Sequence, residues 1–352
     1  MKLTSTRDIQ LPTAVLGLAM RADGTRLYAA CMDGIIYRIN PADNSIKPFA
    51  DAHSSYASGC VLLPDSQTLI SAGYDGQLMW HDVVKKTCFR RVQAHNFWSW
   101  QLALSPDGKR VASVSGQYLA GGERYEPAPA SEPTVKIFDT LTGDMTHAFE
   151  HLPPVLSVAF SPDGQHLAAA NMMGEVRVWE LASSKCVANF TTPDFTSWGI
   201  IKSPHFCGGV YGLTFAPDGN SLLLCGMGPM GDPMAGNGKQ QWQRWSWREK
   251  PEKLSSIRDG EGGTGLQETL AHTPDGSAFL MAGRQAQGTW TTAVFSSADG
   301  KIITSLDTKS RVTRAQFAAD GKTLYLAAAP GQPAREKGVW KPFGKIHVVS
   351  VA

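Results

Sequence analysis

Short apolar segments alternate with polar turns along the whole chain. In one clear case, Val155–Phe160 and His166–Ala170 flank the turn Ser161-Pro-Asp-Gly164. Apolar runs bounded by such a turn predict two antiparallel strands joined tightly, since proline presets its own φ and glycine accepts a positive one. Six related turns recur elsewhere. The seven aspartates are Asp23, Asp65, Asp107, Asp163, Asp218, Asp275 and Asp320.

The spacing of these turns predicts the architecture. Successive aspartates lie 42, 42, 56, 55, 57 and 45 residues apart. A period near 42 with occasional extra residues is typical of blade repeats. A third strand follows a Gly-led turn, as at 174–179, and a fourth follows a polar turn, as at 145–149. The sequence therefore predicts an all-β, seven-bladed β-propeller with four antiparallel strands per blade.

The whole chain, 1–352, is expected to form this single domain, because the repeats leave no block outside it. The last blade lacks a fourth strand in sequence order, and we expect the N-terminal segment 2–10 to supply it and close the ring. The alternative is a frayed tail. The expected blades are 14–50, 56–92, 98–149, 154–190, 209–257, 266–306, and 312–351 with 2–10.

The repeats resemble those of the WD-repeat (WD40-type) β-propeller family over nearly the whole chain, most closely at 151–180. The resemblance implies a network in each blade of His, Ser or Thr, Asp and Trp. That network is patchy here, which suggests a divergent, bacterial-style member. Blade two has His53, Ser71 and Asp75 but His81 in the Trp place; blade three has His95, Ser113 and Phe138; blade four has His151 and Trp179 but Ala169 and Met173.

Composition narrows the function classes. The formal net charge is +2, which favours neither a nucleic-acid nor a membrane partner. The six cysteines form no Cys-x-x-Cys pair, and no cofactor or metal is expected. Since neither a signal-peptide core nor an apolar run of about 20 residues occurs, we expect a cytoplasmic protein, with a mature secreted fragment as the alternative.

Four long insertions interrupt the repeats at 120–133, 191–208, 226–238 and 330–344. Each falls between a second and a third strand or between two blades. By alternation these connections share one face, opposite the Pro-Asp-Gly turns. Long loops on a rigid scaffold commonly carry recognition, although neutral drift is an alternative, since surface insertions cost little loop entropy.

The insertion-bearing rim should also carry aromatic and basic side chains. Trp, Tyr and Arg dominate binding hot spots, although Trp98 or Trp100 could instead pack between blades, as we expect of Trp245 and Trp247. The candidate partner-binding residues are Tyr56, Trp98, Trp100, Trp198, Tyr211, Glu268, Arg311, Arg314 and Trp340.

Our main functional hypothesis is a non-catalytic scaffold that binds a protein or peptide on this rim and the central funnel. A further hypothesis is that the chain is part of a larger assembly. No Gly-x-Ser-x-Gly elbow or phosphate-binding loop occurs, and we assign no catalytic residue. The alternative is a propeller enzyme or small-ligand-binding protein, with a pocket lined by Tyr211, Glu268, Arg314 and His205. We expect no metal at His53, His95, His151 and His205, since the first two lie one whole repeat apart.

Overall fold

A computed structural model gives the backbone of most of the chain. The described residues are 1–49, 51–116, 120–121, 126–127, 131–198, 206–228, 238–257, 263–331, 335–336 and 339–352. They fall into two compact units. The first comprises Met1–Gln93, Ala271–Arg284 and Thr289–Ala352, and the second comprises Ala94–Leu270 and Gln285–Gly288.

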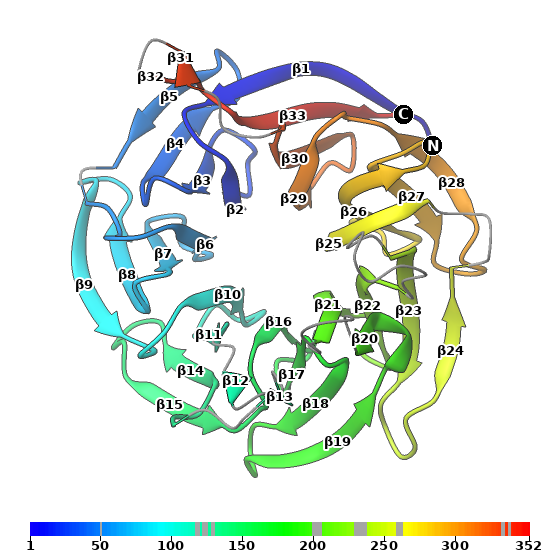
Figure 1. Ribbon diagram of the computed structural model, residues 1–352. Coiled ribbons are helices and arrows are strands. Elements are labelled where there is room, and N and C mark those ends of the chain that lie inside the picture. The colour runs from blue at the N-terminus through cyan, green and yellow to red at the C-terminus, as the bar shows by residue number, and fades with distance from the viewer. Residues whose placement is uncertain are drawn as a thin grey trace. The chain divides into compact units, whose positions relative to one another are not determined.

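The first unit contains blades one, two and seven and most of blade six. Its strands alternate along the chain with tight turns (Figure 1). Blade one is β2 (Val15–Met20), β3 (Leu27–Cys31), β4 (Ile36–Asn40) and β5 (Ser45–Pro48); blade two is β6 (Ala57–Leu62), β7 (Thr68–Gly73), β8 (Gln77–Asp82) and β9 (Thr87–Gln93). Blade six contributes β26 (Ala278–Gln287), β27 (Thr292–Ser296) and β28 (Ile302–Leu306); blade seven is β29 (Arg311–Phe317), β30 (Thr323–Ala329), β33 (Gly344–Val351) and β1 (Leu3–Leu11).

The second unit contains blades three, four and five and most of β25 (Thr264–His272), the first strand of blade six. Blade three is β10 (Ser99–Leu104), β11 (Arg110–Ser115), β14 (Val135–Asp139) and β15 (Met145–Phe149); blade four is β16 (Val155–Phe160), β17 (His166–Asn171), β18 (Glu175–Glu180) and β19 (Lys185–Thr191). Blade five is β21 (Phe206–Phe215), β22 (Ser221–Met227), β23 (Gln240–Ser246) and β24 (Lys253–Ser256), with β20 (Thr196–Trp198) as a fifth strand.

The described strands thus form seven sheets of four or five strands, each running from a first to a last strand in chain order except the closing blade. The chain is a seven-bladed β-propeller, which confirms the predicted fold class.

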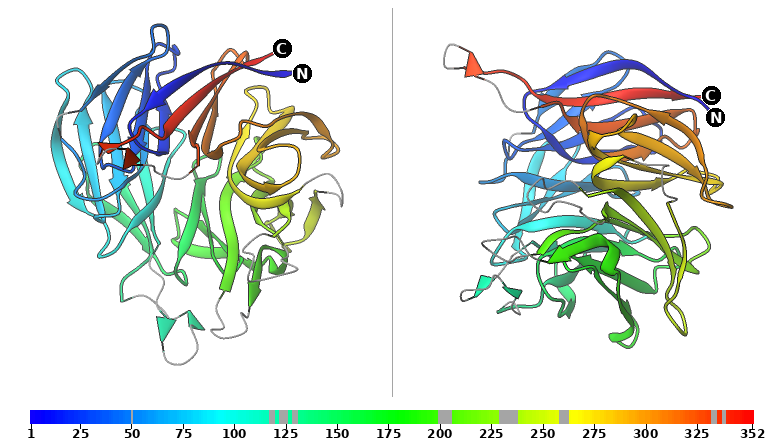
Figure 2. Two further views of the ribbon diagram at one scale, coloured as in Figure 1. Left: turned by 45° about the horizontal axis from the view of Figure 1, so that its top comes forward. Right: turned by 45° about the vertical axis from the view of Figure 1, so that its right-hand side comes forward.

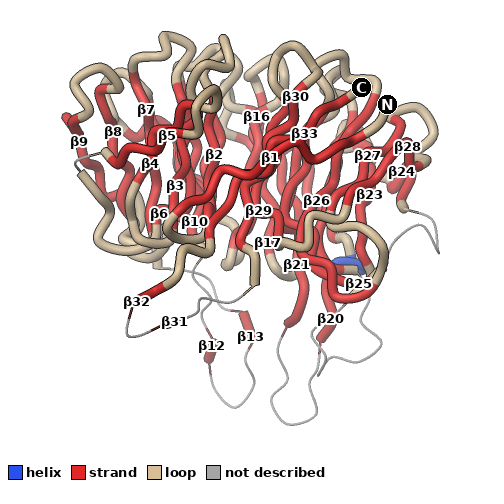
Figure 3. The backbone as a smooth tube through the Cα atoms, turned by 90° about the horizontal axis from the view of Figure 1, so that it is seen from above, coloured by secondary structure: helices blue, strands red, loops and turns tan. Residues whose placement is uncertain are grey.

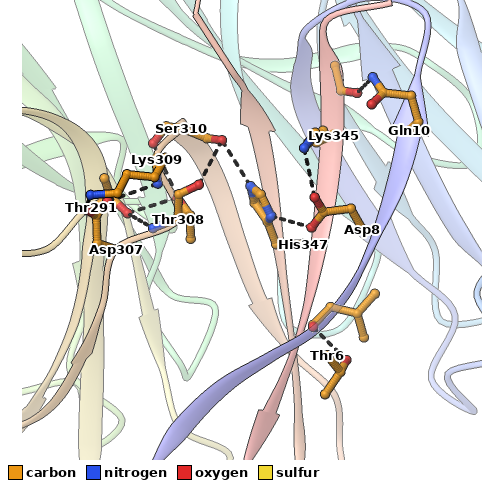
Figure 4. Close-up of polar contacts among 12 residues, drawn as sticks. Thr6, Asp8, Gln10, Thr291, Asp307, Thr308, Lys309, Ser310, Lys345 and His347 are labelled. Atoms are coloured by element: carbon orange, nitrogen blue, oxygen red, sulfur yellow. Dashed lines mark hydrogen bonds and ion pairs between the residues drawn. The ribbon is translucent and has the colours of Figure 1, made fainter.

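The closing blade takes its outer strand from the N-terminus, as predicted. Strand β1 pairs antiparallel with β33 from Leu3↔Val351 to Leu11↔Gly344, and the two chain ends lie side by side (Figure 2). The Asp8 carboxylate accepts hydrogen bonds from Lys345 Nζ at 2.8 Å and His347 Nδ1 at 2.7 Å (Figure 4). Burial alone would raise the pKa of Asp8, but these two bonds outweigh it and lower the pKa, so charge reinforces the closure.

The seven recurrent turns join first and second strands, and each holds itself together locally. In blade three the Asp107 carboxylate accepts from the Lys109 N–H at 3.0 Å, and Gly108 has φ +72°. In all seven turns the Asp carboxylate accepts a hydrogen bond from the backbone N–H of the residue two positions later. Ser66, which replaces the glycine in the second turn, also adopts a positive φ of 55°, a conformation that costs a non-glycine residue energy.

The core lies between neighbouring sheets. One buried cluster joins blades three and four through residues such as Ile137 and Leu167. Another joins blades four and five and contains Trp247, whose ring lies edge-on to His166 at 4.9 Å. Trp245 stacks on Phe190 at 4.9 Å. Both tryptophans therefore pack between blades, as expected.

The insertions contain short strands of their own. Between β11 and β14, β12 (Ala120–Gly121) pairs with β13 (Glu126–Pro127); between β30 and β33, β31 (Arg335–Glu336) pairs with β32 (Val339–Trp340). β20 lies between blades four and five, after the 3-10 turn η1 (Pro193–Phe195). Within the second unit, β12, β13 and β20 lie at the same edge of the blades (Figure 3). The insertion at 226–238 falls mostly outside the described residues.

Candidate interaction surface

The loop that opens blade three presents an aromatic pair. Phe97 and Trp98 stack with ring centroids 4.6 Å apart and an interplanar angle of 26°. Trp98 is 39% exposed although it is a large apolar residue. Stacked rings restrict each other's rotation. A partner that packs on Trp98 would therefore cost little additional side-chain entropy. Trp98 is the more exposed of the two candidate tryptophans whose side chains the structure describes.

An ion pair whose side chains are only 11% and 15% exposed fixes this loop. Glu132, which ends the blade-three insertion, accepts the Asn96 N–H at 2.6 Å and the Lys136 ammonium at 2.8 Å. Lys136 also donates to the Ala94 carbonyl at 2.7 Å. Burial by itself would raise the pKa of Glu132, but the bonds from Lys136 and Asn96 outweigh it and lower the pKa. The ionised carboxylate therefore ties the insertion to the loop that carries Trp98.

Trp100 is placed differently from Trp98. It lies at a register shift between Ser99 and Gln101, where β10 contains one residue more than β11. Its half-buried ring packs against the cluster between blades three and four, and a Cβ on Gly116 would come within 2.8 Å of it. Bulges of this kind re-aim a side chain. Equivalent register shifts put Leu156 at the bulge of β16 in blade four and Tyr211 at the bulge of β21 in blade five.

The insertion at 191–208, between blades four and five, is anchored at its base in the same way. Asp194 accepts hydrogen bonds from Gln243 Nε2 at 2.8 Å and from Lys253 Nζ at 2.9 Å, while the adjacent Phe195 is fully buried. β20 then pairs with the start of β21. Backbones approach closely here: a Cβ on Gly226 would lie 2.0 Å from the Gly209 carbonyl. The start of this insertion is therefore held in a fixed geometry.

The remaining candidates are distributed over both units. In the second unit Tyr211 is half-buried on β21 and Glu268 is buried on β25. In the first unit Tyr56 is 41% exposed with its ring 5.5 Å from that of Tyr74. Arg311 is exposed and Arg314 half-buried on β29, with Arg314 Nη1 donating to the Thr313 carbonyl at 2.7 Å. The side chains of Trp198 and Trp340, and all of His205, lie outside the described residues.

The histidines expected to be structural are buried. In blade two, His53 Nδ1 lies 3.0 Å from Asp75, His53 Nε2 lies 2.8 Å from Ser71 Oγ, and Ser71 Oγ lies 2.9 Å from His81 Nε2. His81 therefore takes the hydrogen-bonding place that the resemblance gives to tryptophan. Burial, with a smaller contribution from the charge of His53, lowers the pKa of His81 to about 4, which keeps it neutral at pH 7.

Blade four replaces this polar network by packing. With Ala169 and Met173 in the polar positions, Trp179 stacks on Phe149 at 5.0 Å, and His151 lies edge-on to Trp179 at 6.0 Å. Burial lowers the pKa of His151 to about 3. Across the described ranges, no group of three or more His, Cys, Asp or Glu side chains could hold a metal ion.

Comparisons with known proteins agree with the fold. The family "WD domain, G-beta repeat" matches residues 143–180, within blades three and four. The chain is 24% identical over 219 residues to U3 small nucleolar RNA-associated protein 4 homolog of Homo sapiens, covering 61% of this chain and 29% of that protein. It is 27% identical over 160 residues to Target of rapamycin complex subunit wat1 of Schizosaccharomyces pombe, covering 46% and 42%. It is 30% identical over 132 residues to Actin-interacting protein 1 of Drosophila melanogaster, covering 35% and 20%.

The match over 143–180 agrees with the resemblance of the repeats to WD40-type repeats. In each relative named above, the match spans less than half of that protein's length. All three are eukaryotic, so they give no support to the expected bacterial-style origin. In the part of the chain that the structure describes, no helix is long and apolar enough to cross a membrane.

Proposed function

We propose that this protein is a non-catalytic interaction scaffold that binds a protein or peptide partner at the insertion-bearing ends of blades three to five. The observation that carries the proposal is the exposed Trp98 ring, which stacks on Phe97 in a loop that the Glu132–Lys136 ion pair fixes. An ordered aromatic surface loses little conformational entropy when a partner binds. The proposed contacts also include Tyr211 in the second unit and, as separate candidates, Tyr56, Arg311 and Arg314 in the first unit.

The relatives support the same class of function. One is named as a complex subunit and another as actin-interacting. Those names describe the relatives, and they favour an assembly role here over catalysis. We further propose a cytoplasmic location and membership of a larger assembly.

The test is affinity capture with matched variants. Trp98→Ala removes the exposed ring, whereas Leu141→Ala removes an 82% exposed apolar side chain in the turn between β14 and β15, at the opposite end of the same blade. We expect Trp98→Ala to lose at least about 2 kcal/mol of partner binding, as hot-spot aromatics do, and Leu141→Ala to retain it. Near-UV circular dichroism checks that both variants remain folded. Equal partner recovery by both would refute the proposal.

A further inference from the structure

The outer strand of blade two, β9, differs in charge from the other outer strands of its unit. Lys85, Lys86, Arg90 and Arg91 lie within the nine residues 85–93, and no acidic residue occurs between 83 and 93. By contrast, β5 has a single lysine and a terminal proline, β28 has no charged residue, and β1 balances Arg7 with Asp8. The turn with Lys85 and Lys86 and the strand β9 with Arg90 and Arg91 therefore form a concentrated basic stripe on a chain whose formal net charge is only +2.

Three of these four cations are accessible, and Arg90 is half-buried. The side chain of Lys85 is 78% exposed and that of Arg91 is 46% exposed, and Lys86 is also exposed. Asp82 lies 3.8 Å from Lys85, at the edge of ion-pair range. Because β9 is the last strand of the order β6-β7-β8-β9, its side chains lie at the margin of the sheet. An anionic chain could approach the stripe along its length.

An apolar anchor lies in the middle of the stripe. The register shifts so that Arg90 faces Trp80 and Cys88 faces His81, which leaves Phe89 as a bulge. The Phe89 side chain is 54% exposed. The Arg90 guanidinium lies 5.7 Å from the ring centroids of both Phe89 and Trp80, so it braces the exposed ring against the buried one. The bulge also disrupts the regular edge that strand addition requires.

A carboxylate of the chain itself shows what this strand binds. Asp51 Oδ2 accepts the Cys88 N–H at 2.8 Å, and Asp51 Oδ1 accepts from Arg91 Nη2 at 3.1 Å. The strand thus already coordinates one carboxylate through a backbone N–H and a guanidinium. Charge-assisted bonds of this type are stronger than neutral ones.

We propose that β9 is a second docking surface, which binds an acidic extended protein segment through side-chain contacts. Carboxylates of the segment contact Lys85 and Lys86, in the turn that leads into β9, and one apolar residue packs on Phe89. Strand addition is not part of this mode, because the bulge at Phe89 interrupts the edge. The surface is independent of Trp98.

Fluorescence anisotropy of the full chain tests the proposal. The probe is a short fluorescein-labelled peptide of glutamates with one central leucine, and its lysine counterpart is the control peptide. We expect the acidic peptide to bind, and Lys85→Glu/Lys86→Glu to weaken binding by about tenfold or more at low salt. Phe89→Ser should weaken it about fivefold. Lys109→Glu/Lys185→Glu makes the same charge change at exposed lysines elsewhere and should have little effect.

Each further result decides between modes of binding. Unchanged affinity for a peptide with alternate N-methylated residues supports side-chain recognition, whereas its loss would indicate strand addition and overturn the mode proposed. Equal binding of acidic and lysine peptides overturns the surface. The proposed surface is also overturned if the chain binds DNA or anionic vesicles through the same lysines but does not bind the acidic peptide. Trp98→Ala should leave the peptide affinity unchanged, which separates this test from that of the proposed function.

Discussion

The two ends of the blades in the second unit are built differently. At one end, the turns of blades three, four and five hold themselves together: Asp107, Asp163 and Asp218 each bond to an N–H two residues on. At the other end, the connections are held by distant residues: Glu132 bonds to Asn96 across 36 positions, and Asp194 to Gln243 across 49. The turns repeat one local solution, whereas the two connections that carry Glu132 and Asp194 each have a long-range anchor. The first end therefore depends on local sequence, whereas these two connections at the second end depend on contacts between distant residues.

The largest expected effect comes from breaking the blade-three anchor. Glu132→Ala leaves the nearly buried Lys136 ammonium and the Asn96 N–H without their carboxylate. Removing one member of a buried ion pair costs about 3 kcal/mol, and we expect this loss in urea unfolding. The matched change Asp107→Ala, in the turn at the other end of the blade, should cost less than about 1 kcal/mol. Equal losses would abolish the distinction between the two ends.

The anchor at Asp194 should contribute less to the free energy of unfolding, because it is more exposed. Asp194 and Lys253 are about two-fifths exposed, so their ion pair contributes little. Asp194→Ala still leaves the buried Gln243 amide short of an acceptor, at a cost of about 1–2 kcal/mol. Lys250→Ala, which removes only the exposed pair with Glu252, is the control. A loss for Asp194→Ala no greater than that of the control would show that the insertion is not anchored.

Acid should release the blade-three anchor. Because the folded-state pKa of Glu132 lies below its ordinary value of 4.5, its ionised form stabilises the fold above pH 4.5. This contribution is lost as the pH falls through the folded pKa. Glu132→Gln should therefore narrow the difference in unfolding free energy between pH 6 and pH 3 relative to the unaltered chain. A pH dependence identical to that of the unaltered chain would contradict the assignment.

The smallest effect is expected in a turn. Ser66 has φ 55° where the other turns have glycine. Ser66→Gly relieves that conformation but adds entropy to the unfolded chain, so the net change should stay within about 1 kcal/mol and favour the fold. Thermal unfolding measures it. Destabilisation would mean that Ser66 has a role that its turn geometry does not show.

The same contrast explains what the sequence can predict. The turns depend on three or four neighbouring residues, so their repetition predicts seven blades, and the unmatched last blade predicts the pairing of β1 with β33. The resemblance also points to the partners of His53, although the bond from His81 to Ser71 depends on side-chain placement that the repeat pattern does not give.

The candidate site is less predictable, because its determinants are distant in sequence. Nothing near Glu132 or Asp194 marks them as anchors, and the extra strand β20 has no periodic signal. Trp98 and Trp100 lie two residues apart, and only the bulge in β10 separates the exposed ring from the one packed against the core. Bulges of this kind leave no pattern that a single sequence reveals.

Hydrogen–deuterium exchange with a captured partner tests the central claim most directly. We predict slower exchange on binding in segments 94–98, 131–135 and 194–198, which form the anchored connections, and unchanged exchange in the turns at 105–111, 161–167 and 216–222. Protection of the turns with unaltered exchange in the connections would contradict the account.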